Sequence, residues 1–151
     1  TNCTAAPYAS YLLKKENMTD MDLQNAKDLI RMSEDQFTFW DIVPNDHGIK
    51  RFAAPCVVEQ YKYWTPVDAS AHNVSMAFLN LYEATGDQLA FAKAKALIDN
   101  MTIVQNKCSG QMPTTWDLRS PERELRRTFW TNCTWASVTA LLRMAELTGQ
   151  E

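Results

Sequence analysis

The sequence predicts an all-α fold built from repeated α/α-hairpins. Two helical patterns joined by a tight glycine turn form the clearest hairpin, and its turn motif at 83–86 (EATG) returns at 146–149 (ELTG), 63 residues later. A motif of the outer helix, AKxLI at 26–30, likewise returns at 94–98, a spacing of 68 residues. A nearly constant period of this length is typical of a repeat architecture.

Three repeat units follow from these spacings. The opening sequence TNCT at 1–4 reappears at 131–134, about twice the period, which places the first and third units in register. The 151 residues then form a single α/α-hairpin repeat domain with units at about 1–68, 69–130 and 131–151. We expect inner helices at about 5–16, 69–84 and 131–147, and outer helices at about 20–38 and 87–105.

The middle unit carries the strongest helical signals. From Val74 to Ala84 nearly every residue is apolar, so this helix has no wide polar face and is expected to lie enclosed by other helices. Gly86 can adopt the left-handed conformation that ends a helix, and Asp87 can accept hydrogen bonds from the first free amides of the next one. That next helix is amphipathic and therefore outer; its apolar stripe comprises Ala90, Ala94, Leu97, Met101 and Val104.

Two long connections, 39–68 and 106–130, separate each outer helix from the next inner helix. They far exceed the usual length, whereas the turns inside hairpins take only a few residues. Because antiparallel helices alternate in direction, both connections must emerge at the same end of the bundle. Nine of the chain's 16 aromatic residues lie in them, so these rings either pack over the helix ends or line a binding cleft.

Composition narrows the classes of function. A net charge of −3 disfavours binding to a phosphate backbone, so no nucleic acid partner is expected. No apolar run approaches the roughly 20 residues of a membrane span and no leader is visible, so a soluble chain without a membrane span is expected. The four cysteines show no C-x-x-C spacing, which disfavours a zinc ribbon or a thioredoxin-like site.

Three features resemble the six-hairpin α/α toroids: alternating inner and outer helices, the hairpin turn at 81–87 (LYEATGD), and an outer helix followed by Gln105, Gly110 and MPTTW at 112–116. This fold occurs in many bacterial carbohydrate-active enzymes, including unsaturated glucuronyl hydrolases, arabinofuranosidases and several polysaccharide lyases. The resemblance implies a glycoside hydrolase or polysaccharide lyase in the periplasm or outside the cell. The zinc site of the arabinofuranosidase branch is not expected, because the chain has no adjacent cysteine pair.

A toroid of six such units needs about 390 residues at this repeat length, because each unit buries its face only against its neighbours. The chain therefore corresponds to an incomplete toroid of about two and a half hairpins. Its terminal hairpins are expected to carry an apolar flank. The rest of a parent chain, or self-association with a second copy, would cover that flank.

Glycoside cleavage needs two carboxyl groups across the scissile bond, one protonated and one ionised. Glu59 and Asp117 are the catalytic candidates, because each neighbours aromatic residues on a different long connection. The alternative is that they are solvated loop acids, or partners of an arginine such as Arg119. Asp68 is a third catalytic candidate, but it also suits the N-cap of the middle inner helix, which is the interpretation that we favour.

Sugar rings are expected to stack on aromatic side chains in a cleft between the two connections. Aligning the Thr-Gly turns matches His72 with Trp135, in the first turns of inner helices near the floor of this cleft. His72 then suits an acid, a base or a sugar contact, and a hydrogen-bonded structural histidine is the alternative. The expected substrate-binding residues are Trp40, Tyr61, Trp64, His72, Trp116, Trp130 and Asn132.

Two functions from different classes follow. The first is an enzyme that binds an oligosaccharide or polysaccharide between 39–68 and 106–130; the second is a non-catalytic helical-repeat module that binds a glycan or a protein through the same face. Two carboxyl groups within about 5–10 Å across an open cleft favour the enzyme.

No metal or other cofactor is expected. The segment Asp41–His47 holds oxygen and imidazole ligands without a recognised spacing, so calcium there stays an open alternative.

Overall fold

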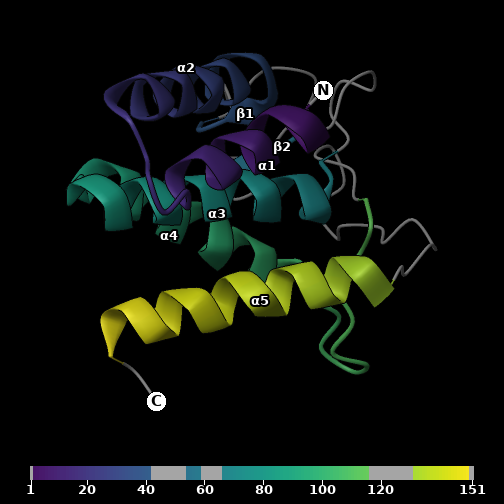
Figure 1. Cartoon of the computed structure of the whole chain (residues 1–151). Coiled ribbons are helices and arrows are strands. Elements are labelled where there is room, and N and C mark those ends of the chain that lie inside the picture. The colour runs from purple at the N-terminus through teal and green to yellow at the C-terminus, as the bar shows by residue number, and fades with distance from the viewer. Residues whose placement is uncertain (1, 42–53, 59–65, 116–130, 150–151) are drawn as a thin grey trace.

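The computed structural model describes residues 2–41, 54–58, 66–115 and 131–149 (Figure 1). Within these ranges the chain is predominantly helical, which confirms the predicted all-α class. None of the helices in these ranges is long and apolar enough to cross a membrane. The elements in chain order are α1 (Asn2–Leu13), α2 (Asp20–Phe37), β1 (Thr38–Phe39), β2 (Cys56–Val57), α3 (Asp68–Thr85), α4 (Gln88–Ile103) and α5 (Thr131–Thr148).

The helices form two hairpins and one further helix. α1 packs against α2 and α3 packs against α4, while α3 also contacts α1, α2 and α5. Figure 1 shows α1, α3 and α5 running in the same direction, with α2 returning in the opposite direction. α3 is therefore surrounded by other helices, as its nearly all-apolar sequence predicts.

The first hairpin is held by contacts at the start of α2. Thr19 and Asp22 form a capping box, in which Thr19 Oγ1 accepts from the Asp22 N–H at 3.1 Å and the Asp22 carboxylate accepts from the Thr19 N–H at 3.0 Å. Lys15 Nζ donates to the same carboxylate at 2.8 Å, and this hydrogen bond, with those from Thr19, lowers the pKa of Asp22 to about 2.

α1 begins and ends three residues earlier than predicted, because the repeated TNCT sequence, which also opens α5, marks its start.

The turn between α3 and α4 has the geometry that its sequence predicts. Gly86 adopts a left-handed conformation with φ 74°, and its N–H donates to the Tyr82 carbonyl at 2.7 Å. Asp87 caps α4, since its Oδ1 accepts from the amides of Leu89 at 2.9 Å and Ala90 at 3.3 Å. The predicted apolar stripe of α4 is buried; the buried residues of this helix are Ala90, Ala94, Leu97, Ile98, Asn100 and Met101.

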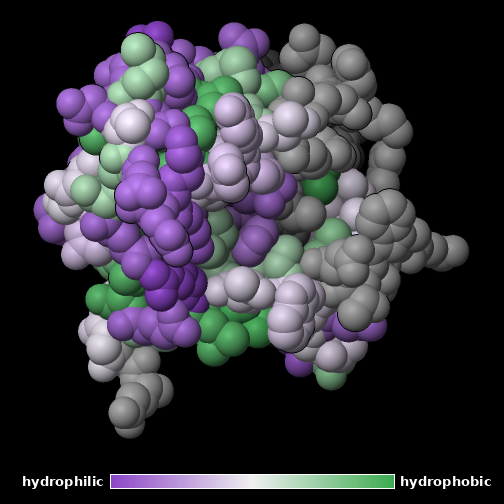
Figure 2. Space-filling view, in the orientation of Figure 1, coloured by the Kyte–Doolittle hydropathy of each residue, from purple (hydrophilic) through white to green (hydrophobic). Residues whose placement is uncertain are grey.

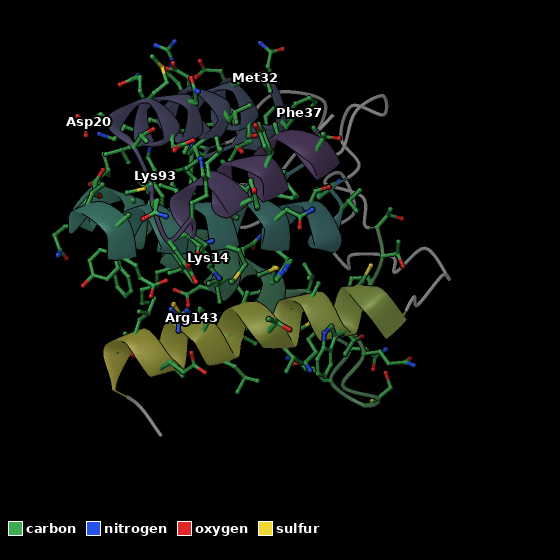
Figure 3. All side chains as sticks on the ribbon, viewed as in Figure 1. Lys14, Asp20, Met32, Phe37, Lys93 and Arg143 are labelled. Carbon is green, nitrogen blue, oxygen red and sulfur yellow. The ribbon has the colours of Figure 1, made fainter. Side chains whose placement is uncertain are left out.

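Apolar side chains fill the space between the helices, and ion pairs join helices of different hairpins. Leu79 of α3 and Ile98 of α4 are completely buried in this core. Lys93 of α4 pairs with Glu34 of α2, and Arg143 of α5 pairs with Glu83 of α3. Figure 3 shows both cationic side chains pointing from their own helix toward the neighbouring helices. The two hairpins and α5 thus pack together around α3.

Candidate functional site

Both long connections meet at one end of the bundle, which we call the loop end: the end at which α2 finishes and α3 and α5 begin (Figure 1). β1 pairs antiparallel with β2, so that Thr38 lies opposite Val57. Two isolated antiparallel bridges continue this pairing, from Val58 to Pro66 and from Val67 to Thr115. The second bridge joins the two connections directly, as the alternation of helix directions predicts.

These pairs place four residues in one row across the loop end. The Val58–Pro66 register sets Val57 opposite Val67, whose N–H donates to the Val57 carbonyl at 2.9 Å. We call the resulting line of residues the paired row; it comprises Thr38, Val57, Val67 and Thr115. Since neighbouring strands lie about 4.8 Å apart, two segments separated by a third lie about 10 Å apart. The segments that carry Val57 and Thr115 run in the same direction, because each is antiparallel to the segment between them.

The candidate carboxyl groups follow the paired row in the sequence. Glu59 comes two residues after Val57, and Asp117 comes two residues after Thr115. The two segments that lead into Glu59 and Asp117 therefore lie near each other at the loop end, as far as the structure describes them. The acids themselves and most of the aromatic candidates lie outside the described residues, so their roles stay predictions; these residues are Glu59, Tyr61, Trp64, Trp116, Asp117 and Trp130.

The approach to Thr115 is shaped by side chain to backbone hydrogen bonds that follow α4. Asn106 Oδ1 accepts from two following amides at 2.9 and 3.0 Å, which forms a tight turn. Gln105 Nε2 donates to the carbonyl of Gly110, a residue in the left-handed conformation, at 2.6 Å. The Met112 N–H donates to Thr134 Oγ1 at 3.1 Å and so fixes the connection to α5. The residues that carry the toroid resemblance after α4 thus position one edge of the site.

Trp40 follows β1 in the chain, and its ring packs against α3 and α4. Its ring centroid lies 6.0 Å from that of Phe78 on α3, and Lys93 Nζ lies 5.5 Å from each of the two ring centroids. The pairing of Lys93 with Glu34 holds the ammonium group in this place. Trp40 therefore packs against the middle of α3 and α4 and not over the helix ends, and its sugar contact stays a prediction.

His72 lies near the start of α3, at the interface with α5. It is half-buried, the backbone of Ala136 lies beside its ring, and its enclosed Nδ1 has no hydrogen-bond partner among the described residues. Burial lowers the pKa of His72 from its usual 6.5, and the nearby backbone of Ala136 opposes this change. A neutral histidine packed between two helices fits a structural role, but its Nδ1 lacks, among the described residues, the hydrogen bond that this alternative expected. Its catalytic or sugar-binding role stays a prediction.

The low pKa of His72 predicts that acid destabilises the α3–α5 interface. The unfolded chain takes up a proton on His72 as the pH falls below 6.5, while the folded chain resists protonation, so stability present above 6.5 is lost below it. Urea unfolding of the protein and of His72→Gln at about pH 7.5 and about pH 5 measures this effect. The free energy of unfolding should fall less on acidification in the variant; an equal fall in both proteins contradicts the prediction.

Asp68 and Asn132 lie at the starts of α3 and α5. α3 begins at Asp68 and its N-cap is Val67, which forms no side-chain cap hydrogen bond, so the expectation that Asp68 caps this helix is wrong. The reason is the bridge from Val67 to Thr115, which holds Val67 in an extended conformation directly before the helix. Asn132 is the second residue of α5. Both positions are at the loop end, and the catalytic role of Asp68 and the substrate contact of Asn132 stay predictions.

Metal ligands do not gather in the part of the chain that the structure describes: no three His, Cys, Asp or Glu side chains form a potential metal site there. The segment considered for calcium, Asp41–His47, lies outside the described residues apart from Asp41. The described arrangement at the loop end is therefore one of paired backbone, partly buried aromatic rings and polar residues at helix starts.

Comparison of the sequence with protein-family models and with curated proteins gave no match. The loop end and the packing of the helices therefore carry the functional interpretation.

Proposed function

We propose that this protein is a carbohydrate-active domain of the α/α-toroid type, either a glycoside hydrolase or a polysaccharide lyase. The oligosaccharide binds at the loop end, between the connections 39–68 and 106–130. Glu59 and Asp117 supply the two carboxyl groups, one from each connection. The hairpins α1–α2 and α3–α4, together with α5, provide the scaffold and correspond to part of a larger ring.

The observation that supports this proposal is the paired row. It holds Val57 and Thr115 about 10 Å apart on segments that run in the same direction. Glu59 and Asp117 each follow their paired residue by two positions, so both connections present a carboxyl group at the same distance along the chain. Inverting glycosidases separate their carboxyl groups by about 6.5–9.5 Å, and retaining ones by about 5–5.5 Å. The spacing of the segments is thus of the order that a pair of catalytic carboxyl groups needs.

The aromatic residues of the same connections supply the second element of a sugar site. Tyr61 and Trp64 follow Glu59 closely, and Trp116 directly follows Thr115 of the paired row. Flat apolar rings with a polar edge suit the faces of sugar rings, and the adjoining carboxyl groups suit their hydroxyls. This grouping supports a carbohydrate ligand over a purely apolar one.

A non-catalytic helical-repeat module is the second candidate function. The placement of Trp40 and His72 favours it, because the two candidates whose side chains the structure describes both take part in helix packing. In this case the loop end binds a glycan or a protein segment without cleaving it. The two candidates differ in one measurable property, the formation of product.

A panel of plant and host polysaccharides, incubated with the protein, tests the proposal. New reducing ends without ultraviolet absorbance indicate hydrolysis, whereas reducing ends together with the absorbance of an unsaturated product indicate elimination. Immobilised glycans of the same panel report binding. Retention on a glycan without any product favours the binding module, and neither binding nor product across the panel overturns the proposal.

A further inference from the structure

One side of α5 carries apolar side chains in solvent: Trp135 and Val138 border a groove shared with Met76 of α3, and Leu142 borders both this groove and the one against α4. Trp135, Val138 and Leu142 recur at spacings of three and four residues, and Trp135 and Leu142 are 73% and 61% exposed. Figure 2 shows hydrophobic surface over the middle of α5, the lowest helix in that view. Exposed apolar residues that follow one face of a helix mark an interaction surface more often than scattered ones do.

The structure repeats the geometry of α3 in α5, at the spacing of 63 residues. Thr85 Oγ1 donates to the carbonyl four residues earlier, that of Leu81, at 2.6 Å; Thr148 Oγ1 donates to the equivalent Met144 carbonyl at 3.0 Å. The glycines that follow, Gly86 and Gly149, adopt left-handed conformations with φ 74° and 66°. α5 therefore matches α3 residue by residue in its last turn, and the turn after α3 leads into α4.

Equivalent positions of the two helices differ in what covers them. Leu79 of α3 is 0% exposed, whereas Leu142, its equivalent in α5, is 61% exposed. Phe78 is fully buried, while its equivalent Leu141 is only half-buried. The side chains are suited to a core in both helices, but among the described elements α3 is covered on this side and α5 is covered only in part.

Two grooves allow the surroundings of α3 and α5 to be compared within the described residues. The groove between the first and second hairpins has a volume of about 160 Å³ and is lined by α2, α3 and α4, including Lys27 and Phe78. The groove between α4 and α5 is larger, about 400 Å³, and is lined by Lys95 and Leu141, the repeat equivalents of those two residues. α4 and α5 therefore line the second groove as α2 and α3 line the first. The first groove has a third wall, formed by α4, and no described helix forms such a wall in the second groove.

We propose that the groove between α4 and α5 is a docking surface for one amphipathic α-helix that lies antiparallel to α5, as α4 lies against α3. The helix that fills the equivalent position in this chain defines the chemistry of the occupant. α4 has small residues in its first turns and larger apolar residues later, and the inner face comprises Ala90, Ala94, Leu97, Ile98 and Met101. An occupant with this pattern buries the half-exposed side chains of α5 and extends the α3–α4 packing by one helix. The proposal is independent of the ligand bound at the loop end.

Aromatic packing in the α3–α4 hairpin indicates how the docked helix contacts the groove. Tyr82 of α3 and Phe91 of α4 pack with ring centroids 5.0 Å apart. The position of Tyr82 is taken in α5 by Ala145, and the groove is lined by Ala145 together with Phe91. The smaller side chain leaves room for a bulky residue from the docked helix, placed against the ring of Phe91.

An extended protein tests this proposal directly. A second copy of residues 87–105 is joined after Gly149, so that the added helix follows the same kind of turn that precedes α4. Docking should raise the melting temperature by about 5 °C and reduce the fluorescence of a dye that binds exposed apolar surface. The matched control carries the same added helix with Leu97→Gln, Ile98→Gln and Met101→Gln in the added copy only, and should show neither change.

A variant in the groove and a measurement of mass complete the test. Leu141→Glu in α5 should abolish the gain from the added helix, because it places a charge in the proposed interface. An equal gain with the control helix, or no gain with the unmodified one, overturns the proposal. Light scattering on the unextended chain gives a second route to refutation. A dimer that Leu141→Glu dissociates would show that a second copy, and not a single helix, covers this groove.

Discussion

Glu59→Gln and Asp117→Asn are each expected to lower the rate of product formation from a cleaved polysaccharide by about 100- to 10,000-fold. This is the usual contribution of a carboxyl group that transfers a proton in the transition state. Each substitution keeps the size and shape of the side chain but removes its ability to ionise, and it replaces one accepting oxygen by an NH2 group that donates. Binding of the intact polysaccharide should change much less than the rate, because the carboxyl groups act mainly on the transition state.

The matched controls for these variants are other acids of the same two connections. Asp46→Asn changes an acid of the first connection, and Glu122→Gln changes one of the second, with the same loss of one negative charge. Both controls should keep nearly full activity, measured as initial rates over a range of substrate concentrations. Full activity in Glu59→Gln and Asp117→Asn would remove the catalytic assignment, and a similar loss in the controls would reduce it to a general effect of charge.

Leu79→Ala is expected to lower the free energy of unfolding by about 2–5 kcal/mol. Leu79 is completely buried in α3, so the substitution removes apolar contacts and leaves a cavity that the surrounding helices can close only in part. Leu142→Ala provides a control with the same chemical change at the repeat-equivalent position of α5. Because Leu142 is 61% exposed, its substitution should change the free energy of unfolding by only about 0.5 kcal/mol.

Urea unfolding followed by circular dichroism measures both changes. The difference between the two variants is the quantity of interest, since it reports the environment and not the residue type. Similar losses in the two variants would contradict the view that α5 has an uncovered face where α3 has a core. In the protein extended by an α4-type helix, the loss caused by Leu142→Ala should increase, because the docked helix then buries part of that side chain.

The helices could be predicted because local signals fixed each of them. The glycine turn at Gly86, the acid at Asp87 and the apolar run of α3 all act within a few residues, and the structure confirms the turn, the cap and the enclosed helix. The capping box at Thr19 and Asp22 has an equally local signal, a threonine followed three residues later by an acid, and it marks the start of α2.

The pairing at the loop end could not be predicted in the same way. β1 and β2 have two residues each, too few to show the alternation that identifies a strand, and the bridge from Val67 to Thr115 joins positions far apart in the chain. The roles of Trp40 and His72 also depend on distant partners, Phe78 on α3 and the Ala136 backbone on α5. Single-sequence patterns contain no information on such contacts, which is why the N-cap was assigned to Asp68 and not to Val67.

The paired row has a consequence for how this protein can diversify. Because Val57 and Val67 are hydrogen-bonded to each other, they fix both ends of the second half of the first connection, and the residues between them can change in number and type without moving the helices. The bridge to Val67 likewise fixes Thr115, the residue directly before 116–130 of the second connection. Selection for a new ligand would therefore act on two segments that are separated from the determinants of stability, and homologues should keep Glu59 and Asp117 but differ most in the remaining residues of 59–65 and 116–130.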